Sequence, residues 1–239
     1  MSELLIRKLE RRDLLSREEK NVLRNAFVRT QTLRADEDIV HEGDRPAESC
    51  LLLDGFAARY NLLADGRRQI SAIHIAGDFV DLHSFLLKTM DHGVMTLSPV
   101  RVTFVPHATL AQISRDYPHL TRLLWLSTLI DSAIHRRWLT VMGRSTATAQ
   151  MAHLICELHC RMKEIGLCDD GAFHVPMTQE ELGDTLGLST VHVNRVLAEL
   201  RNAGIVKWQQ NEVTILDLER LSEIGEFSPA YLHLRLEPR

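Results

Sequence analysis

The segment MTQEELGDTLGLSTVHVNRVLAELRNAG, residues 177–204, decides how the C-terminal part of the chain folds. Thr178, with Glu181 three places on, makes a capping box that starts a first helix. Gly187 suits the left-handed conformation that ends this helix, and Ser189 caps a second helix. Two short helices joined by so tight a turn cross at a large angle. The segment therefore predicts a helix-turn-helix.

The second predicted helix of this segment sorts its side chains onto two faces. Its inward stripe is apolar and consists of Val193, Val196, Leu197 and Leu200. Its outward residues, which stay available to a partner, are Val191, Asn194, Arg195, Ala198 and Asn202. A helix displayed in this way can enter the major groove of DNA.

The outward side chains suit the edges of base pairs. The planar fork of Arg195 can bond O6 and N7 of guanine together, Asn194 can read adenine, and Val191 can pack on a thymine methyl. Polar residues at the helix start suit phosphate contact, helped by the partial positive charge of a helix N-terminus. The predicted DNA-binding set is Thr178, Ser189, Thr190, Val191, His192, Asn194 and Arg195.

The charge of the chain sets a condition on DNA binding. Its 239 residues include 28 Lys and Arg against 32 Asp and Glu, a net charge of -4, and the part from Thr140 onward has 9 against 14. Without a global positive field, affinity must come from focused contacts and from two half-sites. The alternative is a ligand-binding or protein-interaction module of a signalling protein that does not bind DNA, with the Val191 face as the protein contact.

The rest of the C-terminal part predicts a small wing beside these helices. A helix over residues 148–165 is followed by a polar loop at 169–171, and strands at 204–208 and 212–216 form a hairpin before a terminal helical segment. Helices followed by such a hairpin are expected of a winged helix-turn-helix.

The N-terminal part predicts a lead-in helix, capped by Ser16 and Glu19, and then a meander of strands. Turn pairs at intervals of 11, 11 and 12 residues favour a sandwich or barrel; they are Gly43-Asp44, Asp54-Gly55, Asp65-Gly66 and Gly77-Asp78. The clearest hairpin joins residues 60–64 to 67–74, because Asp-Gly supplies the positive φ angles of a tight primed turn. The strands are expected to end near Pro106.

A long helix of about 25 residues is expected between the two parts, against an average of about 11 to 12. Its apolar stripe consists of Leu120, Leu123, Leu124, Ser127, Ile130, Ile134, Trp138 and Val141. A homodimer seam is the simple interpretation of so long a stripe, and packing on its own barrel is the alternative. Gly143, with Ser145 or Thr146 as the next cap, marks a boundary. The predicted domains are 1–116, 117–143 and 144–239.

Together these features resemble the CRP/FNR superfamily of bacterial transcription regulators, relatives of the cyclic-AMP receptor protein. The helix-turn-helix with its wing, the long helix, the glycine-punctuated strands and the segment GDFVDLHSFL (77–86) carry the resemblance. It implies an α+β fold: an N-terminal β-roll of the jelly-roll, cyclic-nucleotide-binding-like kind, a central dimerisation helix and a C-terminal winged helix-turn-helix. It also implies a homodimer on a palindromic site in double-stranded DNA, with RNA polymerase and a small-molecule effector as further partners.

The chain departs from the family where nucleotide-binding relatives hold their ligand. The family's ribose-binding Glu corresponds to Leu82, and where these relatives place an arginine against the cyclic phosphate, residues 90–95 contain none and Arg101 is the next. A buried phosphate without a cationic partner is poorly accommodated, so no response to cyclic AMP is expected. The family's base-reading Glu is Val191 here, and only Arg195 carries over as a base reader.

Several polar residues are candidates for an effector pocket between barrel and central helix, although they do not identify the effector. They are His83, Ser84, His92, His135 and Arg136, and the alternative is that they are scattered surface or hydrogen-bonded residues.

A second group, His153, Cys156, Glu157 and Cys160, shares one helix face that could hold zinc. Core packing is the favoured interpretation of that face, and no metal is assigned. The cysteine spacing does not match the iron-sulfur cluster of oxygen-sensing relatives, so such a cluster is not expected. Redox or metal sensing by Cys156, Cys160 and Cys168 stays open.

Composition excludes other classes of protein. A content of 45% hydrophobic and 25% charged residues suits a soluble globular chain, and four cysteines fit a reducing compartment. Residues 1–20 lack the apolar core of a signal peptide, and the apolar stretch 120–134 is interrupted by charges. A cytoplasmic protein without membrane contact is expected. No nucleophile elbow, phosphate-cradling loop or His-Glu-x-x-His motif indicates an enzyme.

Overall fold

The computed structural model describes residues 2–238, which form two compact units. Within this range the first unit contains residues 2–61, 71–132 and 233–238, and the second contains 62–70 and 133–232. The division falls inside the long helix, whereas the predicted domains divide the chain at the ends of that helix. The three-domain division therefore stays a prediction.

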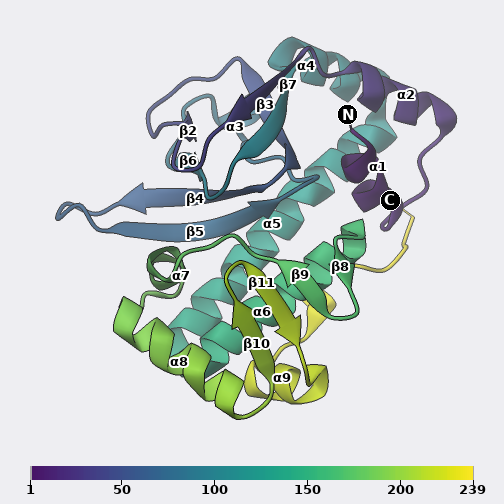
Figure 1. Ribbon diagram of the computed structural model, residues 1–239. Coiled ribbons are helices and arrows are strands. Elements are labelled where there is room, and N and C mark those ends of the chain that lie inside the picture. Colours follow the sequence, from purple (N-terminus) through teal and green to yellow (C-terminus); the bar gives the residue numbers. More distant parts are fainter. Residues whose placement is uncertain (1, 239) are drawn as a thin grey trace. The chain divides into compact units, whose positions relative to one another are not determined.

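Strands β1 to β7 form the predicted β-roll (Figure 1). One sheet has the order β1-β7-β3 and the other β2-β6-β4-β5. Side chains from both sheets, among them Leu52, Ala57 and Val102, are buried in one apolar core. The strands are β1 (Arg29–Leu33), β2 (Asp38–Val40), β3 (Glu48–Asp54), β4 (Phe56–Leu62), β5 (Arg68–Ile75), β6 (Gly93–Thr96) and β7 (Val100–Pro106).

The four predicted turns are present, and the glycine of each has a positive φ angle. The turn between β4 and β5 nevertheless differs in type from the prediction. Gly66 has a φ of +84°, but Asp65 is not among the residues with positive φ. The amide of Gly66 donates to the carbonyl of Leu63 at 2.9 Å. This is a three-residue loop with one left-handed glycine, not the predicted two-residue primed turn.

Two helices precede the strands, α1 (Glu3–Glu10) and α2 (Arg17–Asn25), whereas the sequence predicts one. The capping box that predicts α2 is confirmed, since Ser16 and Glu19 each accept a hydrogen bond from the other's backbone amide. Helix α1 has no side-chain cap, so its start lacks that signal. The short α3 (Ser84–Leu87) precedes β6, and α4 (His107–Asp116) follows β7.

The long central helix α5 (Pro118–Arg144) has 27 residues. The structure buries the apolar side chains of the stripe that the sequence assigns to a homodimer seam, including Leu120, Leu123 and Trp138. These side chains pack inside their own chain, so the assignment of this stripe to a dimer seam is wrong. A different face of α5 is exposed, and it carries Trp125, Leu129 and Leu139.

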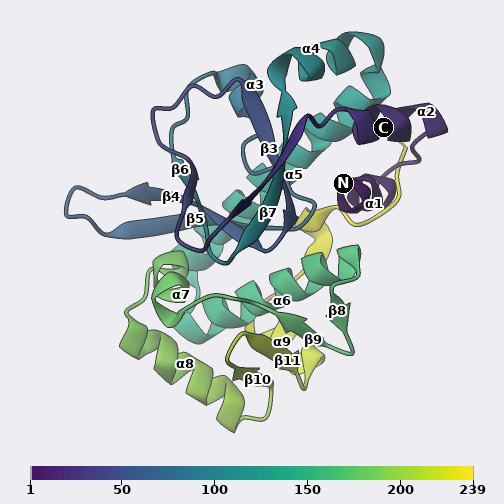
Figure 2. The same ribbon diagram turned by 45° about the horizontal axis from the view of Figure 1, so that its top comes forward.

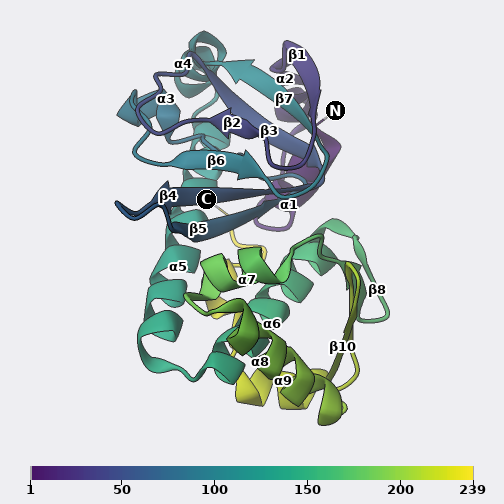
Figure 3. The same ribbon diagram turned by 60° about the vertical axis from the view of Figure 1, so that its left-hand side comes forward.

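The second unit contains the predicted winged helix-turn-helix, in which α6 packs against α7, α8 and α9 (Figure 3). Its wing belongs to a four-stranded sheet of order β10-β11-β9-β8. None of the helices in residues 2–238 has the length and apolar character needed to cross a bilayer. The bounds are α6 (Ala147–Ile165), β8 (Cys168–Asp169), β9 (Ala172–His174), α7 (Gln179–Leu186), α8 (Thr190–Asn202), β10 (Val206–Gln209), β11 (Glu212–Ile215), α9 (Leu218–Ile224) and a 3-10 helix (Pro229–Leu232).

The stretch predicted as a polar loop at 169–171 is part of a hairpin. Asp169 pairs with Ala172, and the two residues between them, Asp170 and Gly171, both have positive φ angles. Here Asp-Gly does form a two-residue turn of the primed kind. The strands on either side are only two and three residues long, too short for alternation to reveal them in sequence.

Candidate nucleic-acid interface and sensor pocket

The turn between α7 and α8 depends on two glycines. Gly187 ends α7 with a φ of +66°, as predicted. Gly183, inside α7, faces the carbonyl oxygen of Leu188, which would lie 2.5 Å from a Cβ atom. Sequence analysis does not identify Gly183, although a glycine in a helix interior costs up to about 1 kcal/mol and is itself a signal of close approach.

The predicted caps hold both helices. The hydroxyl of Thr178 accepts from the amide of Glu181 at 3.2 Å and donates to its carboxylate at 2.9 Å. The hydroxyl of Ser189 accepts from the amide of His192 at 3.3 Å. The Thr178 and Ser189 side chains are thus committed to capping. Thr190, also exposed, begins α8 itself.

Helix α8 has the two faces that its sequence predicts. Val193, Val196 and Leu200 are buried, and Leu197 is half-buried. On the opposite face Val191 is 80% exposed. No other element of this unit covers that face (Figure 2). A large apolar side chain is therefore held in solvent beside the polar residues of the same face.

Arg195 is exposed and has no hydrogen bond or ion pair with any residue in 2–238. Its guanidinium keeps all of its donors for a partner. Asn194 is also exposed, but its amide nitrogen donates to the carbonyl of Thr190 at 3.1 Å. Reading adenine through Asn194 would therefore involve sharing or breaking this local bond.

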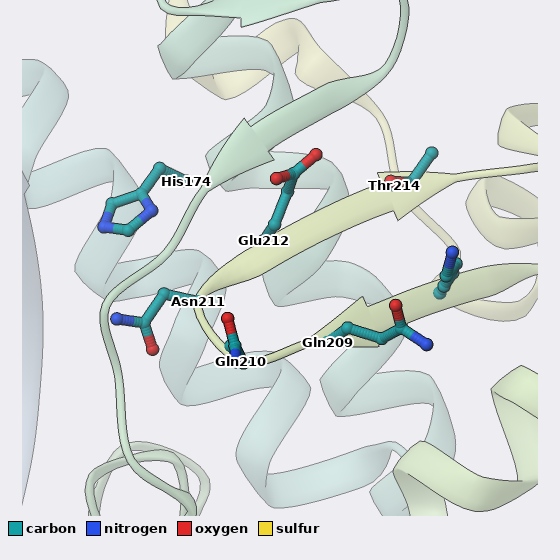
Figure 4. Close-up of a pocket in the computed structure, with 7 residues that line it drawn as sticks. His174, Gln209, Gln210, Asn211, Glu212 and Thr214 are labelled. Carbon is teal, nitrogen blue, oxygen red and sulfur yellow. The ribbon is translucent and has the colours of Figure 1, made fainter.

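The wing adds a polar surface next to the turn that joins β10 and β11. Its outer face carries His174, Lys207, Gln209, Gln210, Asn211, Glu212 and Thr214, which line a depression (Figure 4). Strand pairing sets Lys207 beside Thr214, and Glu212 between His174 and Gln209. Amides and a lysine suit contact with a phosphate backbone. Sequence analysis identifies the wing strands but none of these side chains.

In the first unit the structure brings together two of the candidate effector residues. The rings of His83 and His92 have centroids 4.9 Å apart. Nδ1 of His92 lies 2.6 Å from a carboxylate oxygen of Asp91. Burial lowers the pKa of His83 to about 4 and also lowers the pKa of His92, so both rings are neutral near pH 7.

Ser84 makes its contact with a different histidine. Ser84 is buried, and its hydroxyl lies 3.2 Å from Nε2 of His107. His135 and Arg136 belong to the second compact unit, and Arg136 is exposed on α5.

The first unit contains a charge pair that the sequence does not predict, with a buried arginine and a half-buried aspartate. The guanidinium of Arg59 on β4 bonds the carboxylate of Asp131 on α5 at 3.0 Å. Near it, burial raises the pKa of Asp81 to about 7, against the effect of a 2.6 Å hydrogen bond from the amide of Cys50. The β-roll therefore does contain a buried cation, although Asp131 already offsets its charge.

The helix face considered for zinc is occupied by other contacts. The ring nitrogens of His153 lie 3.0 Å from the carbonyl of Gly225 and 3.0 Å from the hydroxyl of Tyr231. Glu157 accepts hydrogen bonds from Trp138, Arg161 and Tyr231. These contacts support the favoured interpretation of core packing.

The thiols on and near this face are poorly suited to redox chemistry. Burial raises the pKa of Cys156 to about 12 and also raises the pKa values of Cys160 and Cys168. Less thiolate is then present at neutral pH, and the thiolate is the reactive form.

Two family descriptions match the chain. Residues 30–117 match the cyclic nucleotide-binding domain, and residues 149–224 match the Crp-like helix-turn-helix domain. The first covers the β-roll strands and α4, and the second covers α7, α8 and the wing.

Characterised relatives and solved structures agree with these matches. The transcriptional activator protein FnrL of Cereibacter sphaeroides is 24% identical over 197 residues, 81% of this chain and 79% of that protein. The fumarate and nitrate reduction regulatory protein of Shigella dysenteriae is 21% identical, over 88% of this chain and 84% of that protein. The structure of FixK2 from Bradyrhizobium japonicum aligns with a TM-score of 0.76 at 25% identity, over 84% of this chain and 98% of that one.

Proposed function

Because the chain belongs to the CRP/FNR superfamily of transcription regulators, we propose that it binds a palindromic DNA site as a homodimer and reads each half-site with α8. The observation that carries this proposal is the outer face of α8, where Arg195 has no protein partner and Val191 is 80% exposed. A displayed arginine beside an apolar side chain suits guanine and a thymine methyl in a major groove.

The proposed dimer uses the exposed face of α5. Trp125, Leu129, Ser132, Arg136 and Leu139 recur at spacings of 4, 3, 4 and 3 residues. That alternation is the heptad pattern by which two helices pack along a seam. Three of the five are large apolar side chains exposed in the single chain, and a second copy of α5 would cover them.

The β-roll is proposed to respond to a signal and to pass it to DNA binding through α5. Between α5 and α6 lies a short break at Ser145 and Thr146, where Thr146 caps α6 by accepting from the amide of Ala149 at 3.2 Å. A hinge there would re-aim the paired α8 helices on half-sites about one DNA turn apart. We place this activity in the cytoplasm, on DNA, with RNA polymerase and an effector as further partners.

Selection from a random DNA pool followed by a salt titration tests the proposed function. The full chain should enrich a palindromic sequence. If six to ten phosphates are contacted, its affinity for that DNA should fall by a factor of about 10³ to 10⁵ between 50 and 200 mM salt. DNA with scrambled half-sites is the control. Failure to enrich any sequence, or binding that salt does not weaken, would instead favour a protein-interaction module.

A further inference from the structure

A histidine cluster in the β-roll carries chemistry that DNA binding does not use. One ring nitrogen of His83, one of His92 and a carboxylate oxygen of Asp91 all lie within 4.8 Å of one another. We propose that these residues bind a divalent transition-metal ion of the class of Zn²⁺ or Fe²⁺. The proposal goes beyond the proposed function and does not depend on it. Sequence spacing alone does not indicate this site.

The unsatisfied ring nitrogens point to a missing ligand. Nε2 of His83 and Nε2 of His92 are both buried, and neither has a hydrogen-bond partner within residues 2–238. Buried polar atoms are almost always satisfied, so two such atoms on neighbouring rings require an explanation. The ring of His92 is itself 7% exposed. An ion that accepts the lone pairs of both nitrogens would satisfy them together.

Asp91 orients the ring of His92 for metal binding. Nδ1 of His92 lies 2.6 Å from an oxygen of Asp91, so the neutral ring donates a hydrogen bond from Nδ1–H to the carboxylate and carries its lone pair on Nε2. A carboxylate behind a ligating histidine is the usual arrangement at metal sites, because it fixes the tautomer and the ring orientation. Asp91 acts here as a positioning residue, and the two histidine nitrogens supply the ligand atoms.

The surroundings of the two histidines are compatible with a bound metal ion. Metal-ligand bonds near 2 Å place ligand atoms about 3 to 4 Å apart, and the rings of His83 and His92, with centroids 4.9 Å apart, are close enough to share one ion after small rotations. The Asp91 side chain is 74% exposed, so the cluster lies at the surface on that side. Arg59 acts electrostatically on both histidines, but its guanidinium is paired with Asp131 at 3.0 Å. Imidazole nitrogens favour transition metals over Mg²⁺ or Ca²⁺.

Titration of the full chain with Co²⁺, followed by its visible absorption and by competition with Zn²⁺, tests the site. We expect one Co²⁺ per chain, displaced by Zn²⁺, and a melting temperature that rises with the concentration of either ion. The substitutions His83→Gln and His92→Gln should each weaken binding by at least about 100-fold. Asp91→Asn should weaken it by about 10- to 100-fold.

His41 offers a matched control, because it is an exposed histidine whose ring nitrogens lie 3.3 and 3.5 Å from Asp38 and Asp44. The His41→Gln variant should bind Co²⁺ as the unmodified chain does. Absence of Co²⁺ and Zn²⁺ binding, unchanged affinity in Asp91→Asn, or loss of binding in His41→Gln would overturn the proposal. The exposed Asp91 keeps the test decisive even if a variant of a buried histidine fails to fold. DNA binding is not measured, so failure here leaves the proposed function intact.

Discussion

Base recognition is proposed to depend on Arg195. Replacing this residue distinguishes sequence-specific binding from non-specific electrostatic binding to DNA. Arg195→Ala should cost about 1 to 3 kcal/mol of binding free energy and relax preference at one position per half-site, because one bidentate contact is lost. Competition binding against single-base variants of the selected site measures both effects.

Arg201 provides the matched control for this prediction. It is also an exposed arginine of α8, but it lies in the last turn of that helix. Arg201→Ala should leave base preference as it is and change only overall affinity. An Arg195→Ala protein with unaltered preference would remove Arg195 from the reading role.

His119 makes stability depend on pH in the first unit. Its ring nitrogens lie 2.6 Å from Glu19 and 3.2 Å from Asp13, and the hydrogen bond with Glu19 raises its pKa above the ordinary 6.5. A raised pKa in the folded state stabilises the protonated fold. This contribution is complete below about pH 6.5 and is lost as pH rises through the higher folded pKa.

The substitution His119→Gln measures this contribution. The melting temperature of the unmodified chain should exceed that of the variant by more at pH 5.5 than at pH 8.5, and His41→Gln serves as a control at an exposed histidine. A difference that is equal at both pH values, or larger at pH 8.5, would contradict the assignment.

Among the helices, α5 carries apolar residues on two different faces. One stripe is buried in its own chain, and the heptad face of Trp125, Leu129 and Leu139 is left exposed. Leu129→Lys should convert the proposed dimer into a monomer, because it places a charge in the seam. Sedimentation equilibrium measures the change, with Gln112→Lys on the exposed surface of α4 as the control. A protein that is already monomeric, or a dimer insensitive to this change, would contradict the proposed seam.

For the whole molecule, binding of a ligand to the β-roll can be detected as a change in the melting temperature. The resemblance implies that Leu82 stands at the family's ribose-binding position, and the buried Arg59 is already paired with Asp131. Cyclic AMP should therefore leave the melting temperature unchanged, because only a ligand that binds the native state raises it. Differential scanning fluorimetry over a range of nucleotide concentrations checks this, and a dose-dependent rise would show that the pocket accommodates the nucleotide.

The local features of this protein can be predicted from short stretches of its sequence. The capping boxes at Ser16 and Thr178, the left-handed Gly187 and the apolar face of α8 follow from interactions within a few residues of the chain, and neighbouring residue types suffice to specify them. The same is true of the turn glycines that punctuate the β-roll. These features are sufficient to predict the fold class and the helix-turn-helix whose second helix is proposed to read DNA.

Which surfaces pack against each other depends on how distant parts of the chain fold together. Both faces of α5 carry apolar residues at helical spacing, and packing across the chain determines which of them is buried. The pairing of Arg59 with Asp131 joins residues 72 positions apart, and the rings of His83 and His92, which α3 separates in the chain, have centroids 4.9 Å apart. Burial and side-chain approach depend on long-range packing, which no short stretch of sequence contains.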